Sequence, residues 1–286
     1  MSFQCTCPRL AIQKEEGAKP IFFRITNERD YEWYLKNWND KGKLLLIPCG
    51  KCPNCVKRKS QEWTSRLLKE KENFKYCYFV TLTYDDKHLR DINKQDIQLF
   101  LKRYRKNFKL KCKYYITGEY GETSGRSHYH GIFFQDKPLK DLIFYANNLY
   151  VSDSFAKCWS LGNCLISKQV NEQSIKYTIA YTLKKLGESK VVMMSKGLGL
   201  AYLNEHKEEI KDHNGFYVSN GYKQRFPSYF TRKLKESSEP EDILYLLAKE
   251  NEPKESRLLT GRTLGDLADI FMNGLDSKAL KGKGEF

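Results

Sequence analysis

The sequence predicts an α+β fold in which an antiparallel sheet is backed by helices. Stretches rich in aromatic and β-branched residues, typical of buried strands, alternate with stretches whose apolar residues recur at helical spacing. Their order is strand, helix, strand, strand, helix, strand, and one further helix follows. This order suits a sheet with helices on one face and a last helix across the open face. A hydrophobic content of 40% is enough for a substantial core.

The first elements of this order lie between residues 63 and 108. Trp63–Phe74 has helical spacing, and Tyr76–Tyr84 has the composition of a buried strand. Asn93 is a suitable N-cap for the next helix. The apolar positions of that helix are Ile97, Phe100, Leu101, Tyr104 and Phe108.

A hairpin follows in the prediction. Lys113–Tyr120 and His128–Phe134 have strand character, and residues 121–127 form the loop between them. Because the loop is short, we expect the two strands to pair in an antiparallel manner.

The last elements of the core lie between residues 139 and 187. Residues 139–159 are predicted to be mainly helical, and Cys164–Ser167 to be a short strand. Asn171–Leu186 is predicted as a helix with Gly187 at its C′ position.

Composition changes along the chain predict three regions. Residues 1–60 form a Cys-rich N-terminal module, residues 61–187 the α+β core, and residues 188–286 an accessory region of unknown role. We expect this last region to be rich in helix, with helix-prone stretches at 241–249 and 264–272.

The cysteines of the first region predict a structural zinc site. Its thiols are five in number, one more than a tetrahedral zinc requires. They are Cys5, Cys7, Cys49, Cys52 and Cys55. A group of reduced thiols without metal is the alternative interpretation.

The chain is strongly basic, with a formal net charge of +15. Nucleic acid is the polyanion that such a surface most often meets, although a solvated lysine-rich face would give the same composition. Cations are concentrated on and after the helix that Asn93 begins, so we expect DNA contacts from Lys102, Arg103, Arg105, Lys106 and Lys109. A solvated outer helix face is the alternative.

No membrane or secretion signal is evident. The chain starts without a basic-then-apolar pattern, and no apolar stretch approaches the roughly 20 residues that span a bilayer. We therefore expect a cytoplasmic protein without a membrane partner.

Three residues of the predicted hairpin form a candidate metal site. Residues two apart in a strand point to the same face, so His128 and His130 present their imidazoles together while Tyr129 points away. Glu119 lies near the end of the preceding strand, and the hairpin would place it beside the histidines as a third ligand. Such a site leaves positions open for a phosphate oxygen. A chance His-x-His pair is the alternative.

Two tyrosines of the last predicted helix are candidate nucleophiles. Tyr177 and Tyr181 are four residues apart and therefore share one helix face, which Lys184 and Lys185 continue. Nearby cations and a metal-bound phosphate would stabilise a phenolate, and lysine could protonate the departing oxygen. Tyrosines buried in the core of an amphipathic helix are the alternative.

These segments resemble a known family. Residues 79–84 (FVTLTY), 128–134 (HYHGIFF) and 177–185 (YTIAYTLKK) resemble, in this order, the three motifs of HUH-family rolling-circle replication initiators, in particular those of the gokushovirus branch of the Microviridae. Residues 49–55 (CGKCPNC) and 118–121 (GEYG) are also similar to that branch. The resemblance covers most of the chain from Cys49 to about Leu234.

The resemblance implies a fold and an activity. The fold would be an HUH-endonuclease sheet of ferredoxin or RRM-like type. A tyrosine would attack the origin phosphate with the help of Mg²⁺ or Mn²⁺, remain joined to the 5′ end and leave a 3′ hydroxyl that a host polymerase extends. A second tyrosine would close the unit circle. In the motif, a lysine usually stands three residues after the first tyrosine, but here Ala180 stands three residues after Tyr177. Tyr181 and Lys184 keep the full Tyr-x-x-Lys spacing, which favours Tyr181 as the first nucleophile.

The resemblance also implies partners. These are single-stranded or nicked origin DNA and the replicative helicase and polymerase of a bacterial host, in whose cytoplasm the protein would act; no small-molecule substrate is expected. Three other functions stay open: a relaxase or transposase with the same chemistry, a non-catalytic module that binds single-stranded nucleic acid, and a non-haem iron oxygenase built on the same three ligands.

Overall fold

The computed structural model describes residues 5, 9–15, 18–22, 29, 43–121, 124–184, 191–207, 210, 216–219 and 221–237. The chain forms two compact units, one of residues 1–59 with 238–286 and the other of residues 60–237. No described helix is long and apolar enough to cross a membrane. The predicted region boundaries stay predictions, and the helices predicted at 241–249 and 264–272 lie outside the described residues.

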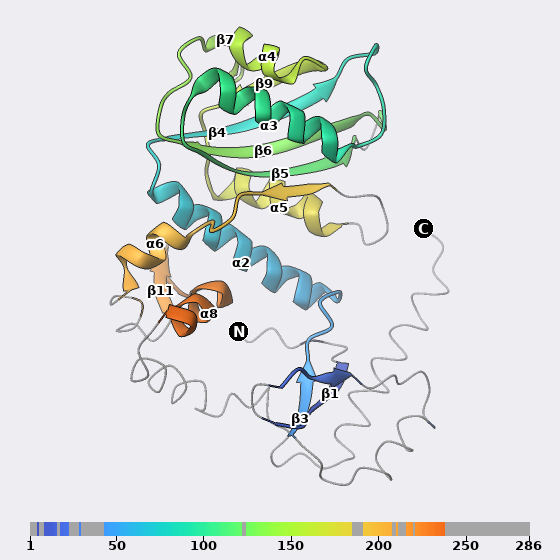
Figure 1. Ribbon diagram of the computed structural model, residues 1–286, viewed down its shortest axis with the longest axis vertical. Helices are drawn as coiled ribbons and strands as arrows, with labels where there is room; N and C mark the ends of the chain where they lie inside the picture. Colours follow the sequence, from blue (N-terminus) through green and yellow to red (C-terminus); the bar gives the residue numbers. More distant parts are fainter. Residues whose placement is uncertain are drawn as a thin grey trace. The chain divides into compact units, whose positions relative to one another are not determined.

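The first unit contains a small antiparallel sheet in the order β2-β1-β3 (Figure 1). Its strands are β1 (Arg9–Gln13), β2 (Ile21–Phe22) and β3 (Lys43–Ile47). Helix α2 (Pro53–Glu72) begins in this unit and continues into the second. Gly50, with φ of 75°, allows the sharp turn between β3 and α2.

The second unit is built on a seven-stranded antiparallel sheet in the order β10-β5-β6-β4-β9-β8-β7. The α+β prediction and its antiparallel sheet are thereby confirmed. The strands are β4 (Tyr76–Tyr84), β5 (Cys112–Tyr120), β6 (Ser127–Gln135), β7 (Ile143–Ala146), β8 (Leu149–Val151), β9 (Gly162–Ser167) and β10 (Val192–Met194).

Helices cover both faces of this sheet. On one face, α3 (Lys94–Phe108) and α4 (Asp153–Trp159) bury an aromatic cluster that includes Phe100, Tyr104 and Phe133. On the other face, α5 (Glu172–Lys184) packs against β5 and β6. The core on that second face consists of Leu67, Tyr115, Ile132, Phe134, Val170, Ile175, Ile179 and Leu198.

The predicted helix over residues 139–159 is wrong in its first half. β7 and β8 form a hairpin there, and only α4 is helical. Asn147 and Asn148 make the tight turn at φ of 47° and 62°, a conformation that asparagine tolerates better than most residues. The hydroxyl of Ser152 then caps α4 by accepting from the Phe155 amide at 3.1 Å. The turn residues thus override the apolar pattern that suggested helix.

The remaining elements of the second unit follow β10. They are α6 (Leu200–Glu205), β11 (Phe216–Ser219), β12 (Tyr222–Arg225) and α8 (Ser228–Ser237). The Arg66 guanidinium of α2 lies between the rings of Trp63 and Tyr229, 4.1 and 3.8 Å from their centroids, and donates to the Leu198 carbonyl. Helix α2 therefore joins α8 and the loop before α6 to the sheet.

A buried ion pair strengthens the same junction. The Glu70 side chain is fully buried, and the Lys113 ammonium of β5 lies 2.7 Å from its Oε1 atom. The Gly199 amide donates to Oε2, and Lys113 also donates to the Gly197 carbonyl. These contacts place a counter-charge beside Oε1 and a hydrogen bond on Oε2 of a carboxylate that would otherwise be very costly to bury.

We expect Lys113→Met to lower the free energy of unfolding by about 3 kcal/mol, because it leaves the Glu70 carboxylate buried without its counter-charge. Urea denaturation followed by circular dichroism measures the effect. Lys111→Met, at an exposed position two residues earlier, is the control. Equal stability of the two variants would show that the pair contributes nothing.

Candidate metal centre and nucleophile

The pairing of β5 with β6 brings the three predicted metal ligands together. Glu119 lies directly opposite His128, and His130 is two residues further along the same strand. The Glu119 Oε1 atom is 2.7 Å from the Nε2 atom of His128 and 2.9 Å from that of His130. The three donor atoms lie within 4.8 Å of one another. One carboxylate oxygen and two imidazole nitrogens at this separation suit a divalent cation.

The Nδ1 atoms of both histidines already have hydrogen-bond partners. The Nδ1 atom of His130 is 3.1 Å from the Thr81 hydroxyl of β4, and that of His128 is 3.0 Å from the Arg126 carbonyl. Such partners fix the ring orientation and leave Nε2 as the nitrogen that a cation would bind. Both imidazoles therefore present Nε2 to the same point.

Electrostatics in the cluster favour charged groups. Burial alone would raise the pKa of Glu119, but hydrogen bonds from His128 and His130 hold it below the ordinary value. Burial alone would lower the pKa of His128, and the hydrogen bond to Glu119 raises it instead. The neighbouring groups thus favour an ionised Glu119 carboxylate and a charged His128 imidazole, and a cation bound there would take the place of the imidazole proton.

One candidate nucleophile lies against this cluster. The Tyr177 ring of α5 is 5.2 Å from the His130 ring and 6.2 Å from the Phe79 ring, centroid to centroid, and the residue is partly exposed to solvent. Phe79 in turn stacks on His130 at 5.5 Å. The structure therefore places the Tyr177 phenol on the same face of the sheet as the metal ligands.

The other predicted members of the nucleophile group are less fully described. Helix α5 continues through Tyr181 and Lys184, but their side chains lie outside the described part of the chain, as does Lys185 altogether. The start of α5 is well defined. Asn171 accepts from the Ser174 amide at 2.9 Å, and the Ser174 hydroxyl accepts from the Asn171 amide at 3.0 Å.

A hydrogen-bond network lies directly behind the histidine strand. Tyr129 points to the face opposite its histidine neighbours, where its buried hydroxyl accepts from the Asn93 amide at 2.7 Å and contacts the Tyr84 hydroxyl at 2.9 Å. Tyr84 also donates to Asp96 at 2.6 Å. This network ties the metal-ligand strand to the start of α3.

Sequence reasoning missed two positioning residues. Thr81 and Arg126 hold the two histidines, yet nothing in the sequence assigns this role to either of them, although Thr81 stands within the segment 79–84. Thr81 lies opposite His130 on one side, and Thr117 lies opposite it on the other. Only the strand register identifies these neighbours, and one sequence does not specify that register.

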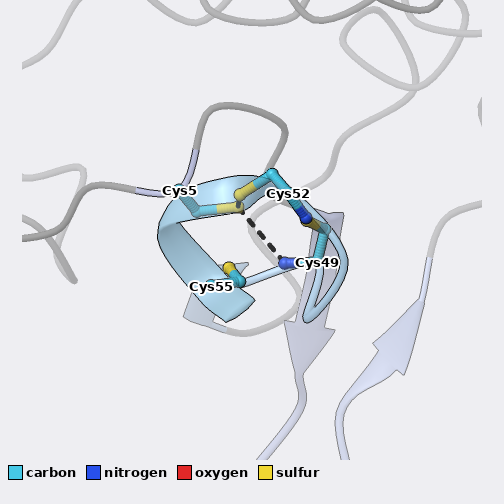
Figure 2. Close-up of side chains that lie close together, drawn as sticks. All are labelled: Cys5, Cys49, Cys52 and Cys55. Carbon is cyan, nitrogen blue, oxygen red and sulfur yellow. Dashed lines mark hydrogen bonds between the residues drawn. The ribbon is translucent and has the colours of Figure 1, made fainter. Parts of the chain in front are cut away.

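Four of the five predicted zinc ligands lie together in the first unit. Cys5, Cys49, Cys52 and Cys55 have sulfur atoms within 4.8 Å of one another, and Figure 2 shows them around the start of α2. The amides of Lys51 and Cys52 donate to the Cys49 sulfur at 3.4 and 3.2 Å. Four converging sulfurs are the donor set of a closed tetrahedral metal site. Cys7 lies outside the described residues.

The basic residues of α3 lie away from the Glu119 and histidine cluster, because α3 covers the opposite face of the sheet. Arg103 has a structural role, because its guanidinium donates to the Cys158 and Trp159 carbonyls at the end of α4, at 2.6 and 3.0 Å. The exposed members are Lys102, Arg105, Lys106 and Lys109. Their contact with DNA stays a prediction.

Similarity to known proteins identifies the family of the chain. Residues 77–186 match the model of the replication-associated protein ORF2 family. The chain is 32% identical to replication-associated protein ORF2 of Spiroplasma virus 4 over 247 residues, which cover 76% of this chain and 77% of that protein. It is 27% identical to replication-associated protein VP4 of Bdellovibrio phage phiMH2K over 279 residues (89% and 88%), and 28% identical to replication-associated protein ORF4 of Chlamydia phage 1 over 265 residues (82% and 65%). No solved structure matches the chain.

The chain therefore belongs to the replication-associated protein ORF2 family and is homologous to phage replication proteins. The resemblance to phage replication initiators is confirmed at this level. Membership of this family implies an interaction with DNA.

We expect Thr81→Val to weaken Mn²⁺ binding about tenfold, because His130 loses the hydroxyl that orients its ring. Isothermal titration without DNA measures the affinity, and Thr81→Ser should restore it. Thr117→Val is a matched control, because Thr117 also flanks His130 but its buried hydroxyl has no hydrogen-bond partner among the described residues. An equal loss in both valine variants would contradict a specific role for Thr81.

Proposed function

We propose that this protein is a site-specific single-strand DNA endonuclease and strand transferase that initiates and terminates rolling-circle replication. The observation that carries the proposal is the Tyr177 ring lying 5.2 Å from His130, within a cluster that can hold a divalent cation. A nucleophile and a phosphate-activating centre are thus adjacent on one face of the sheet.

The reaction is a pair of transesterifications. A phenolate oxygen attacks the origin phosphorus, the bond to the 3′ oxygen breaks, and that oxygen takes up a proton as the 5′ phosphate becomes joined to tyrosine. The energy of the linkage is kept, so a later 3′ hydroxyl can attack the phosphotyrosine and restore the DNA strand. Mg²⁺ or Mn²⁺ at Glu119, His128 and His130 would act as a Lewis acid on the scissile phosphate.

Two tyrosines on one helix suit a reaction with two cleavages. The Tyr-x-x-Lys spacing assigns initiation to Tyr181, with Lys184 or Lys185 protonating the departing oxygen, and Tyr177 then acts at termination. Helix α5 supports this division of labour, because it runs without a break from Glu172 to Lys184 and packs against the two strands that carry the metal ligands.

The relatives favour replication over the other candidate functions. Their names describe replication-associated proteins of phages, which supports an origin of phage DNA as substrate rather than plasmid transfer or transposition. A non-catalytic binding module would leave the Glu119 cluster without a purpose, and an oxygenase would leave the tyrosines without one. The partners are then single-stranded or nicked origin DNA and the host helicase and polymerase, in the cytoplasm of the bacterial host.

The tyrosines are tested with a labelled single-stranded origin oligonucleotide and Mn²⁺, by counting adducts that survive SDS. We expect Tyr181→Phe to reduce the first adduct at least 100-fold, since no phenol remains at the initiating position. Tyr177→Phe should still form this adduct but fail to make the second cut on a substrate that carries a regenerated origin. Gln173→Ala, exposed and one turn before Tyr177, should behave as the wild type. Adducts formed by the double phenylalanine variant would refute the proposal.

We also propose that Cys5, Cys49, Cys52 and Cys55 hold a structural zinc ion. Elemental analysis of the purified protein should give about one zinc per chain, and Cys52→Ser should lose the metal because three thiolates bind it far less tightly. Cys77→Ser, in the second unit, is the control. Cys7→Ser should keep its zinc; a variant at Cys7 that loses zinc, or a Cys52 variant that keeps it, would overturn this ligand set.

A further inference from the structure

The edge strand β7 exposes three consecutive large apolar side chains. Ile143, Phe144 and Tyr145 are 61%, 62% and 64% exposed. β7 is the last strand of the seven-stranded sheet, at the top of Figure 1. Proteins usually protect a free sheet edge with charges, and an exposed run of apolar residues marks a contact surface. This strand carries no charge at all.

The neighbouring strand extends this surface with another ring and a cation. Phe144 lies opposite Tyr150 of β8, and their rings meet edge to face at 5.9 Å. The Lys168 ammonium lies 4.0 Å from the centroid of the Tyr150 ring. Among the described side chains, no carboxylate forms an ion pair with Lys168. Consecutive strand residues point to opposite faces, so Phe144 shares a face with Tyr150, whereas Ile143 and Tyr145 point to the other face. We call Phe144, Tyr150 and Lys168 the hairpin patch.

The patch is held on a fixed support. The Asp141 carboxylate accepts from the Ser152 hydroxyl at 2.7 Å and from the Ser154 amide at 2.8 Å, which joins the entry to β7 to the start of α4. β8 pairs with β9, and β9 pairs with β4 in the centre of the sheet. Rings on such a scaffold lose little conformational freedom when they bind a ligand.

We propose that the hairpin patch binds single-stranded DNA, with an unpaired base stacked on Phe144 and a phosphate beside Lys168. Aromatic rings beside a cation are the combination that recognises single strands irrespective of sequence, because every base has a flat face and every linkage a charge. The net charge of +15 favours a polyanion over an apolar protein partner. A protein would instead add a strand to the free edge of β7, which makes no use of Lys168.

This site is separate from the cleavage centre. In the sheet order, β7 is the fourth strand from β6, which carries the histidines, so about 20 Å lies between them. The inference rests on the DNA interaction that the family implies and deepens the proposed function by giving the cut strand a second anchor. It does not require that the protein cut DNA.

The test compares the affinities of Phe144→Ala and Tyr145→Ala for a fluorescent single strand of about 20 nucleotides, by anisotropy without metal so that no cutting occurs. Phe144→Ala should weaken binding about tenfold. Tyr145→Ala, which removes an equally exposed ring from the other face of β7, should leave the affinity nearly unchanged. Phe144→Trp should restore the affinity, and binding of a duplex of the same sequence should change less than twofold. Leu99→Ala, at an exposed apolar position on α3, is the control.

Direct contact is tested by photocrosslinking of the same oligonucleotide carrying 5-iododeoxyuridine, followed by identification of the crosslinked peptide. We expect the peptide that contains residues 143–150. Unchanged single-strand affinity in Phe144→Ala, an equal loss for duplex, or crosslinks only elsewhere would overturn the inference. A wild-type protein that binds through this peptide but never forms the tyrosine adduct would refute the proposed function and leave the hairpin site standing.

Discussion

The register between β5 and β6 is the constraint on which the candidate site depends. Glu119 faces His128 across the ladder, and a slip of one residue would turn both histidines to the opposite face of the sheet. Tyr129 opposes such a slip, because its hydroxyl exchanges hydrogen bonds with the main chain of Asn93 behind the strand. Moving the strand would leave these buried groups unpaired, so the large residue between the histidines locks the ligands in place.

The candidate nucleophile Tyr177 is positioned by the packing of its helix. Ile175 and Ile179 anchor α5 in the core, and Tyr177 between them emerges at the rim, where its ring meets His130. Two buried residues one turn apart fix both the rotation of the helix about its axis and its position along that axis. The packing of the helix thereby sets where the phenol lies, at a partly exposed position that suits a group receiving a DNA strand from solvent.

The sequence was sufficient for the central strands and for the Glu119 cluster because these depend on local patterns: aromatic and β-branched residues in β4, β5 and β6, and a short loop that favours a hairpin. The sequence did not predict the features that depend on pairing between residues far apart in the chain. The place of Thr81 beside His130 comes from the ladder between β4 and β6, which brings together residues 49 positions apart. The β7–β8 hairpin was missed because two asparagines at positive φ, rather than Asn-Gly, make its turn.

Among the described residues, the basic cluster of α3 and the candidate metal site lie on opposite faces of the sheet. The exposed lysines and arginines of α3 lie behind the sheet, and the less exposed Arg103 donates to the carbonyls at the end of α4. On the ligand face, by contrast, the Nδ1 atoms of both histidines are already bonded to neutral oxygens of Thr81 and Arg126. A divalent cation bound there keeps net positive charge for whatever occupies its open positions, since Glu119 is the one anion among its three ligands. Phosphate affinity at this face would come from a concentrated local charge, whereas the basic helix contributes only a long-range field that salt weakens.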